Sequence, residues 1–363
     1  MIGGIKTEAR AAFAAGLQEP LEQNEKELLA PFETLDDGVS GYVFDLVPLR
    51  MALLAEQSPI ITSPRIPSTF TDLLTILIKA SLTDLPERKP RLANTTHSPH
   101  EVLALIRDAG IDLFDTFWAQ QAATWGVALD FRFPVPRVHD QCGDAIRCGK
   151  HNLGHNLYES RYAHDFKSLE NSFVDGLQYS KRHRDTFDTS GFPDLSVSKG
   201  EEVQPCPCAA CSPIWDNAPL SHSSTLDKCD THREAERAPA YTRAYVHHLL
   251  HTHEMSAHAL LVMHNLTVMD AFMRGIRGVL AQDTQAGSHP FGPDDTDRDC
   301  LTLFTKEVAR FERTYDASLN VLDEARVCWA EVDRARGKGR LARERKLAEE
   351  LRADLPMAAT LDE

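Results

Sequence analysis

Three cysteines stand close together, in the order Cys206-Pro207-Cys208-Ala209-Ala210-Cys211. A histidine-rich segment with a helical pattern follows and ends in Met263-His264-Asn265. Sulfur ligands at this spacing, with imidazoles available for a fourth corner, are typical of closed tetrahedral zinc sites. We therefore predict a Cys3His zinc site whose fourth ligand comes from the downstream histidines.

A cluster of this kind can also arise by chance or from the disulfides of a secreted domain. The chain has eight cysteines, and the five outside the cluster are scattered along it: Cys142, Cys148, Cys229, Cys300 and Cys328. Scattered thiols fit a reducing compartment, which favours metal binding over a disulfide framework.

The composition is that of a globular protein. The chain has 363 residues, 42% of them hydrophobic and 26% charged, which allows one large domain and a smaller one. No apolar run approaches the length that a bilayer requires. The Ala-rich start, residues 1–18, includes the acidic Glu8 and only a short apolar stretch, so we expect an ordinary helix rather than a transit peptide.

The formal net charge of −15 weighs against a protein that grips nucleic acid over much of its surface. Any contact with RNA must therefore be local or shared with a partner. One basic run lies late in the chain, with acidic residues around it, and the sequence favours a solvated helix face there. Its members are Arg334, Arg336, Lys338, Arg340, Arg343, Arg345 and Lys346.

The secondary structure expected to position the candidate site residues differs between the two halves of the chain. In the first half, short β-branched or aromatic runs alternate with helical periodicity, which predicts a parallel α/β architecture. Strands are expected at 42–47, 90–94, 111–115 and 126–133, and helices at 70–82 and 99–110. Residues 138–205 are expected to be long loops or insertions around small helices, residues 212–240 to be a further loop, and the chain from Tyr241 onward to be helical.

Two segments resemble a known family. Residues 241–250, continuing through Glu254-Met255 to Met263-His264-Asn265-Leu266, closely resemble the helical segment that follows the C-x-C-x-x-C cluster of tRNA-guanine transglycosylases. Upstream, residues 85–91, 99–103 and 110–115 resemble the late barrel units of the same family. The resemblance implies a TIM-type (β/α) barrel, shortened at its N-terminus, with a zinc-binding insertion and C-terminal helices.

Four regions follow from this resemblance. We expect a partial (β/α) barrel at 1–137, a loop-rich insertion at 138–205, a Cys3His zinc-binding subdomain with helices at 206–290, and a C-terminal helical segment at 291–363. The opening barrel strands of the family have no counterpart here, since residues 1–5 already look like a mid-barrel strand.

The resemblance implies that Cys206, Cys208, Cys211 and His264 bind one structural zinc ion per subunit. A helix would place His264 on the same apolar face as Leu260 and Leu261, which supports an inward orientation. The rival ligands are His247, His248, His251, His253 and His258. The segment 212–240 is longer than the family's usual step to the helix, a departure that need not move His264 from the metal.

Asp115 matches the position of the family's nucleophile, an aspartate that attacks the ribose and forms a covalent intermediate. Its surroundings differ from those of catalytic members. The family's Cys-Val-x-Pro-Thr-Arg segment is replaced by residues 116–123, which contain no arginine. The glycine-rich base-recognition loop is replaced by residues 45–50.

These departures resemble the non-catalytic eukaryotic members of the family. Such a subunit forms a heterodimer with a catalytic paralogue, which exchanges guanine for queuine at the wobble position of tRNAs with GUN anticodons. The resemblance implies that tRNA is bound through the complex, in the cytoplasm or at the surface of the mitochondrial outer membrane, and that Asp115 is a retained structural residue. The alternatives are an active transglycosylase that uses Asp115 and a zinc-stabilised interaction scaffold.

Overall fold

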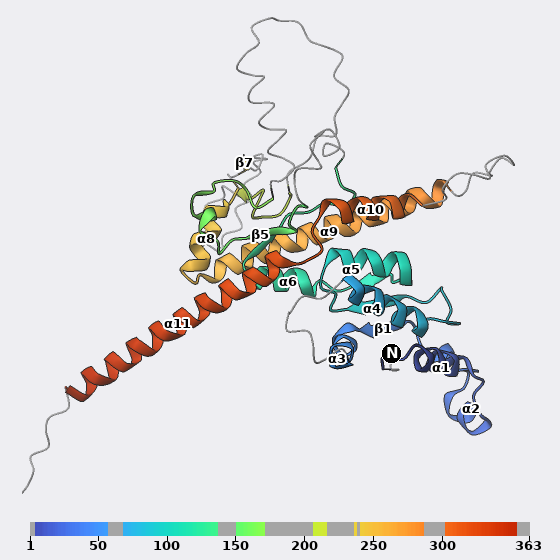
Figure 1. Cartoon of the computed structure of the whole chain (residues 1–363). Helices are drawn as coiled ribbons and strands as arrows, with labels where there is room; N and C mark the ends of the chain where they lie inside the picture. Colours follow the sequence, from blue (N-terminus) through green and yellow to red (C-terminus); the bar gives the residue numbers. More distant parts are fainter. Residues whose placement is uncertain are drawn as a thin grey trace, which may run out of the picture.

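The computed structural model describes residues 4–56, 68–136, 150–170, 206–215, 236–237, 240–286 and 302–353. Helices α1 to α5 gather at one end of the molecule, and the long α11 extends away from the body in the opposite direction (Figure 1). Within these ranges, no helix combines the length and apolar character needed to cross a bilayer.

The first half is an α/β unit, as predicted. Three short strands pair in parallel in the order β1-β2-β3, with Phe44 opposite Ala93 and Ala93 opposite Phe114. Its elements are α1 (Thr7–Gln18), α2 (Gln23–Leu29), a 3-10 turn (Asp36–Gly38), β1 (Tyr42–Asp45), α3 (Leu46–Glu56), α4 (Ser68–Ser81), β2 (Arg91–Asn94), α5 (Pro99–Ala104), a π turn (Leu105–Ala109) and β3 (Leu113–Phe114).

Local sequence explains the helical segment between β2 and β3. The Ser98 hydroxyl accepts the Glu101 backbone N–H at 3.1 Å, and Pro99 occupies the first turn, where no donor is needed. Gly110 ends the segment with a φ of +65°, a left-handed conformation that glycine adopts without strain.

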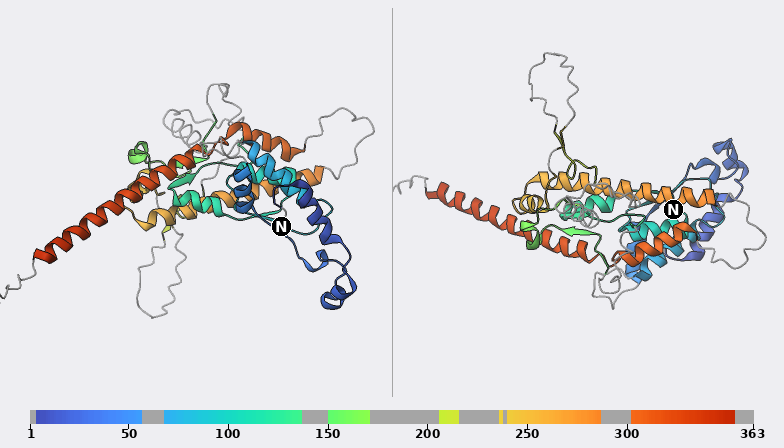
Figure 2. Two further views of the ribbon diagram at one scale, coloured as in Figure 1. Left: turned by 60° about the horizontal axis from the view of Figure 1, so that its bottom comes forward. Right: turned by 90° about the horizontal axis from the view of Figure 1, so that it is seen from above.

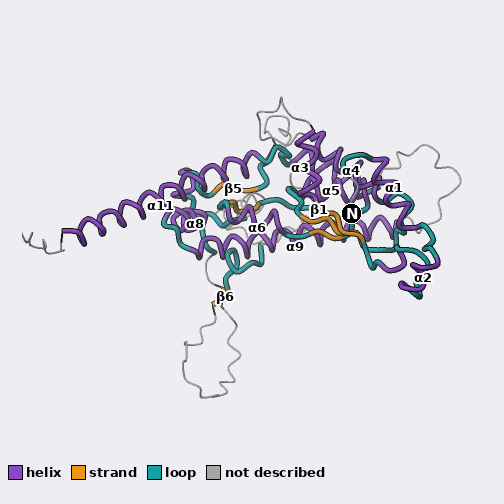
Figure 3. The backbone as a smooth tube through the Cα atoms, turned by 90° about the horizontal axis from the view of Figure 1, so that it is seen from below, coloured by secondary structure: helices purple, strands orange, loops and turns teal. Residues whose placement is uncertain are grey.

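The second half is mainly helical. The elements are α6 (Phe117–Thr124), β4 (Val127–Leu129), β5 (Gly154–Asn156), a 3-10 turn (Ser160–His164), β6 (Ile214–Trp215), β7 (Glu236–Arg237), α8 (Arg243–His251), α9 (Met255–Ala286), α10 (Leu303–Thr314) and α11 (Asn320–Ala353). Helix α9 runs along the body beside α6 and α10, whereas the distal part of α11 stands clear of it (Figures 2 and 3).

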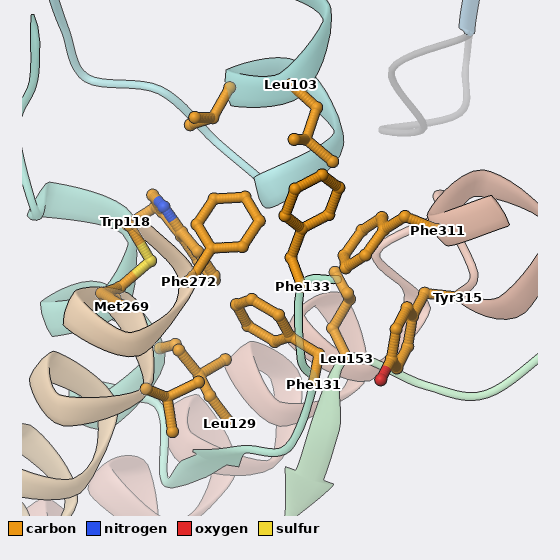
Figure 4. Packing of buried hydrophobic residues seen from close by; sticks show 14 of the residues in the cluster. Leu103, Trp118, Leu129, Phe131, Phe133, Leu153, Met269, Phe272, Phe311 and Tyr315 are labelled. Atoms are coloured by element: carbon orange, nitrogen blue, oxygen red, sulfur yellow. The ribbon is translucent and has the colours of Figure 1, made fainter. Parts of the chain in front are cut away.

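An aromatic core joins the two halves. The Phe131 ring lies edge-on to those of Phe272, Phe311 and Tyr315, with centroids 5.5 to 6.3 Å apart (Figure 4). Val102 and Leu103 of α5 reach into the same cluster. Because burial of apolar area is the main source of stability, this cluster holds the helices of the second half against the α/β unit.

Several expectations need correction. The segment 126–133 does not continue the parallel sheet, because β4 pairs antiparallel with β5. The strand predicted at 42–47 ends at Asp45, whose carboxylate accepts the Val47 N–H at 3.0 Å as α3 begins. Among the described residues the sheets are small and open, and no closed barrel is present.

The two regions expected to be loops contain short strands, which the sequence does not indicate, and the 3-10 turn in the first fits the small helices expected there. Of 138–205, residues 150–170 are described, and they include β5 and a 3-10 turn. Of 212–240, the described residues include the short antiparallel pair β6 and β7. Gly4 and Ile5 form a turn, and the rest of the strand expected at 1–5 lies outside the described residues.

Candidate metal centre

The three cysteines form a tight knuckle. The Cys211 backbone N–H donates to the Cys208 sulfur at 3.2 Å, and the Ser212 N–H donates to the Cys208 carbonyl at 2.8 Å. The Ser212 hydroxyl closes the turn on the Cys206 carbonyl at 2.9 Å. These bonds orient the sulfurs inward, and an N–H that points at a sulfur favours its thiolate form.

His264 enters the knuckle from α9 and is fully buried. Its Nδ1 lies 3.7 Å from the Cys206 sulfur, 3.6 Å from that of Cys208 and 3.4 Å from that of Cys211. Ordinary zinc–sulfur and zinc–nitrogen bonds at tetrahedral angles would place sulfur and nitrogen about 3.6 Å apart. All four ligand atoms lie within 4.8 Å of one another, so the group could hold a metal ion of this size.

The other ring nitrogen of His264 lies 2.8 Å from the Leu129 carbonyl oxygen of β4. Since a carbonyl can only accept, Nε2 carries a proton, which leaves Nδ1, on the side of the sulfurs, as the nitrogen that a metal ion would bind. Such a partner for the distal nitrogen is common in metal sites, where it fixes the orientation of the ring.

Asn265 also forms hydrogen bonds to β4. Its side-chain oxygen accepts the Leu129 N–H at 2.9 Å, and its amide donates to the carbonyls of Ala119 at 3.1 Å and Val127 at 3.0 Å. Asn265 is fully buried and satisfies three backbone groups of α6 and β4. The His-Asn pair thus fastens α9 to β4 while it aims one imidazole at the cysteines.

The electrostatics of the group call for a cation. Hydrogen bonds with Cys208 and Cys211 raise the pKa of the Cys206 thiol, whereas hydrogen bonds with Cys206 and Cys211 lower that of Cys208. Burial alone would lower the pKa of His264, but the adjacent Cys208 and Cys211 sulfurs raise it well above its usual value. A divalent ion would remove this competition for protons, because it binds thiolates and neutral imidazole directly.

The rival histidines lie elsewhere. His247 Nδ1 contacts the Leu157 carbonyl at 2.8 Å, His251 Nε2 contacts that of Tyr158 at 3.1 Å, and His258 Nδ1 lies 3.4 Å from that of Ala123. Neither His248 nor His253 belongs to the four-residue group. These rings connect α8 to the residues that follow β5 and α9 to α6, or are exposed to solvent.

Arg243, at the start of α8, holds the loop that precedes the metal group. Its guanidinium lies 3.2 Å from the Asp165 carboxylate, and its backbone N–H donates to the Lys167 carbonyl at 2.9 Å. The Thr242 side chain caps the helix on the Tyr245 N–H. Thr242 and Arg243, at the beginning of the segment that resembles the family, therefore hold α8 against the loop at residues 165–167.

Asp115 lies at the carboxyl end of β3, as the sequence predicts, and its carboxylate serves the backbone. One oxygen accepts the Thr95 N–H at 2.7 Å, and the other accepts the Phe117 N–H at 3.3 Å, where α6 begins. The carboxylate thus links the end of β2 to the start of α6. Asp115 is not among the four residues that could hold a metal.

A cavity of about 550 Å³ lies between the α/β unit and the α10–α11 connection. Arg50 and Glu101 on its wall form a buried ion pair, and they also bind the Thr95 carbonyl and the His97 N–H. In the sequence, Arg50 stands out only as part of the segment that replaces the family's glycine-rich loop. A lone arginine and glutamate 51 positions apart carry no pattern that would identify the pair.

Comparison with known proteins places the metal group inside a recognised family segment. Residues 203–287 match the family described as "Queuine tRNA-ribosyltransferase". This segment contains all four candidate ligands and Asn265.

Curated proteins named "Queuine tRNA-ribosyltransferase accessory subunit 2" are similar over a longer range. The protein of Danio rerio is 27% identical over 214 residues, which is 58% of this chain and 41% of the relative. The human protein is 27% identical over 231 residues, with the same coverage. That of Drosophila virilis is 25% identical over 207 residues, 57% of this chain and 32% of the relative.

The chain thus spans less than half the length of these relatives. Their similarity confirms the resemblance that the sequence predicts. The Cys3His group lies in the segment that matches the queuine tRNA-ribosyltransferase family model, and the chain is similar to proteins named queuine tRNA-ribosyltransferase accessory subunit 2.

Proposed function

We propose that the chain is a non-catalytic subunit of a queuine tRNA-ribosyltransferase, and that it supports a catalytic paralogue in exchanging guanine for queuine at the tRNA wobble position. The observation that carries this proposal is the coincidence of the family segment with an intact, buried Cys3His group. The relatives bear the name of an accessory subunit, which supports the same role.

The surroundings of Asp115 support a non-catalytic role. Both carboxylate oxygens bind backbone N–H groups, from Thr95 and Phe117, and the following residues 116–123 include no arginine to hold RNA. The competing proposal, an active transglycosylase, rests on the position of Asp115 at the carboxyl end of β3, where barrel enzymes place their chemistry.

We further propose that the metal is one structural zinc ion. Three sulfurs and one imidazole complete a tetrahedron and leave no position for water or substrate, as in sites that stabilise folds rather than catalyse reactions. The ion would connect the knuckle at 206–211 to α9, and through His264 to β4. Metal analysis of the purified chain tests this, and a zinc content well below one ion per chain would contradict it.

The α/β unit is proposed to be part of a TIM-type barrel. Its strands are parallel and sequential, α4 packs against one face, and on the other Val43 and Leu113 remain 48% and 51% exposed. An apolar row that faces away from the helices is what the interior of a barrel would use. A structure of the chain in its complex tests this proposal, which requires further parallel strands beside the sheet.

The decisive experiment is a base-exchange assay with guanine-labelled tRNA. We expect the purified chain alone to be inactive, and a catalytic queuine tRNA-ribosyltransferase to copurify with it and become more active in its presence. Exchange by the chain alone would instead establish the active transglycosylase. Absence of any effect on the catalytic protein would favour a scaffold unrelated to tRNA. Cell fractionation tests the proposed location in the cytoplasm or at the mitochondrial outer surface.

A further inference from the structure

The distal part of α11 is a free-standing helix. Near its start, Val321, Leu322 and Ala325 are buried in the aromatic core, and Cys328, Trp329 and Val332 pack partly against the body. Beyond Val332, the helix leaves the body and extends into solvent in every view (Figures 1 to 3).

This projecting part carries a charge opposite to that of the rest of the chain. Residues 334–346 include seven basic residues and one acidic residue, a net charge of +6 in a chain whose total is −15. Those with described side chains are exposed: Arg334, Arg336, Lys338, Arg343, Arg345 and Lys346. A local basic segment on an acidic protein attracts polyanions to that segment.

The basic residues occupy two sides of the helix. With 3.6 residues per turn, Arg334, Lys338 and Arg345 fall on one side, and Arg336 and Arg343 fall about 180° away. A flat acidic protein surface could contact only one of these sides. The two phosphate strands that border a nucleic-acid groove can contact both.

Two glycines provide an independent indication. Gly337 and Gly339 lie in the middle of the basic segment, where each costs about 1 kcal/mol of helix stability relative to alanine. A Cβ atom at Gly337 would meet nothing within 4 Å, so packing within the chain does not require a glycine there. A missing side chain does, however, let another molecule approach the helix backbone closely.

We propose that residues 334–346 of α11 bind the phosphate backbone of folded RNA, and that this helix is the local RNA contact of an otherwise acidic subunit. The identification of this RNA as tRNA rests on the proposed function. Because the contacts are to phosphates, the interaction is independent of base sequence and weakens with salt.

The test compares two matched variants of the full chain. The first replaces Arg334, Arg336, Lys338 and Arg345 with glutamine. The second replaces the exposed Arg274, Arg277, Lys306 and Arg313 of α9 and α10 with glutamine, and removes the same charge. Binding is measured by fluorescence anisotropy with a tRNA transcript, an unrelated hairpin RNA of equal length, polyglutamate, and anionic phospholipid vesicles, at several salt concentrations.

We expect the wild type to bind both RNAs equally, and to bind polyglutamate and vesicles much more weakly than either RNA. The α11 variant should lose at least about tenfold in affinity, and its slope of log affinity against log salt should fall by up to about 3.6, since each of four phosphate contacts contributes about 0.9. The control variant should stay within about twofold of the wild type.

Equal losses in both variants, no RNA binding by the wild type, or preferential binding to polyglutamate or vesicles would overturn the proposal. The proposed function is tested by a separate measurement, the stimulation of the catalytic paralogue by the chain at saturating tRNA. Loss of that stimulation with salt-dependent RNA binding intact would refute the accessory role alone.

Discussion

Two parts of the molecule, a metal half and a sheet half, differ in what their buried polar side chains bind. The metal half comprises residues 206–215 and 240–286 with β4 and β5, and the sheet half comprises residues 4–56 and 68–115. In the metal half, His264 and Asn265 are fully buried and bind β4 and α6. In the sheet half, the buried Arg50–Glu101 pair is formed within the unit, and an apolar row on β1 and β3 stays exposed.

The two halves differ in how much of their apolar surface their own residues cover. The family match falls on the metal half, where each ligand and its supporting hydrogen bonds come from described residues. The sheet half folds around its own core but presents an apolar face that could pack against more protein. The predictions below are arranged to disturb one half at a time.

The largest effect is expected for Cys208→Ser in the metal half. Structural zinc contributes about 10–16 kcal/mol to the folding of small zinc domains, so losing one thiolate should cost several kcal/mol there. Zinc content should fall from about one ion per chain to nearly none, and thermal unfolding should begin at a lower temperature.

The matched control is Cys328→Ser. Cys328 is partly buried, and its sulfur lies 3.7 Å from the Asn156 amide, outside the metal group. This variant should keep its zinc. Stoichiometric zinc in Cys208→Ser would refute the proposed ligand set.

The second effect concerns the sheet half. Arg50→Met leaves the Glu101 carboxylate buried without its cation, which should lower the free energy of unfolding by about 3–5 kcal/mol. The double variant Arg50→Met/Glu101→Met should cost less than the sum of the single variants, because it removes both charges. Urea unfolding measures the loss, and zinc content should be unchanged. Additive losses would show that the two charges are not coupled.

The third prediction uses pH. Burial lowers the pKa of His97 and of His100 to about 4, with a smaller contribution from Arg50 at His97. Below pH 6.5 the unfolded chain takes up protons that the folded chain excludes, so stability should fall as the pH drops from about 6.5 to 4. The loss is up to about 3 kcal/mol for each ring.

The double variant His97→Gln/His100→Gln isolates this contribution, because acid release of zinc affects variant and wild type alike. Its free energy of unfolding, relative to the wild type, should improve as the pH falls. A difference that is constant between pH 7 and pH 4 would show that neither ring is held neutral.

The smallest effect is expected for Asp115→Asn. The amide oxygen can still accept one backbone N–H, so the variant should lose only about 1 kcal/mol from the weakened link between Thr95 and Phe117. Chemical denaturation measures this, with zinc content as the control. If the free energy of unfolding fell by several kcal/mol, Asp115 would contribute more to stability than these two hydrogen bonds.

Local patterns make part of this structure predictable. The spacing of Cys206, Cys208 and Cys211 predicts the knuckle, and Ser98, Pro99 and Gly110 predict the bounds of the segment between β2 and β3. The helical position of His264 beside Leu260 and Leu261 favours its inward orientation, which the structure confirms. Each of these signals is contained in a few neighbouring residues.

Long-range contacts account for what sequence patterns do not reveal. Asn265 binds backbone groups 136 to 146 residues away, which nothing near it in the sequence indicates. The antiparallel partner of β4 lies in a polar segment with no strand pattern, so the prediction that 126–133 joins the parallel sheet is wrong. The identity of the metal ligands is predictable without these contacts, because the cysteine spacing and the helical position of His264 are local signals. The orientation of the His264 ring is not, because it depends on the Leu129 carbonyl of β4.

The most direct test of the account is the base-exchange assay of the complex with Cys208→Ser and Asp115→Asn compared side by side. If the chain supports catalysis through its metal half, Asp115→Asn should stimulate the catalytic paralogue as well as the wild type does. Cys208→Ser should reduce stimulation by about tenfold or more, equivalent to at least about 1.4 kcal/mol. Loss of exchange in Asp115→Asn, with full activity in Cys208→Ser, would contradict the account and assign the chemistry to this chain.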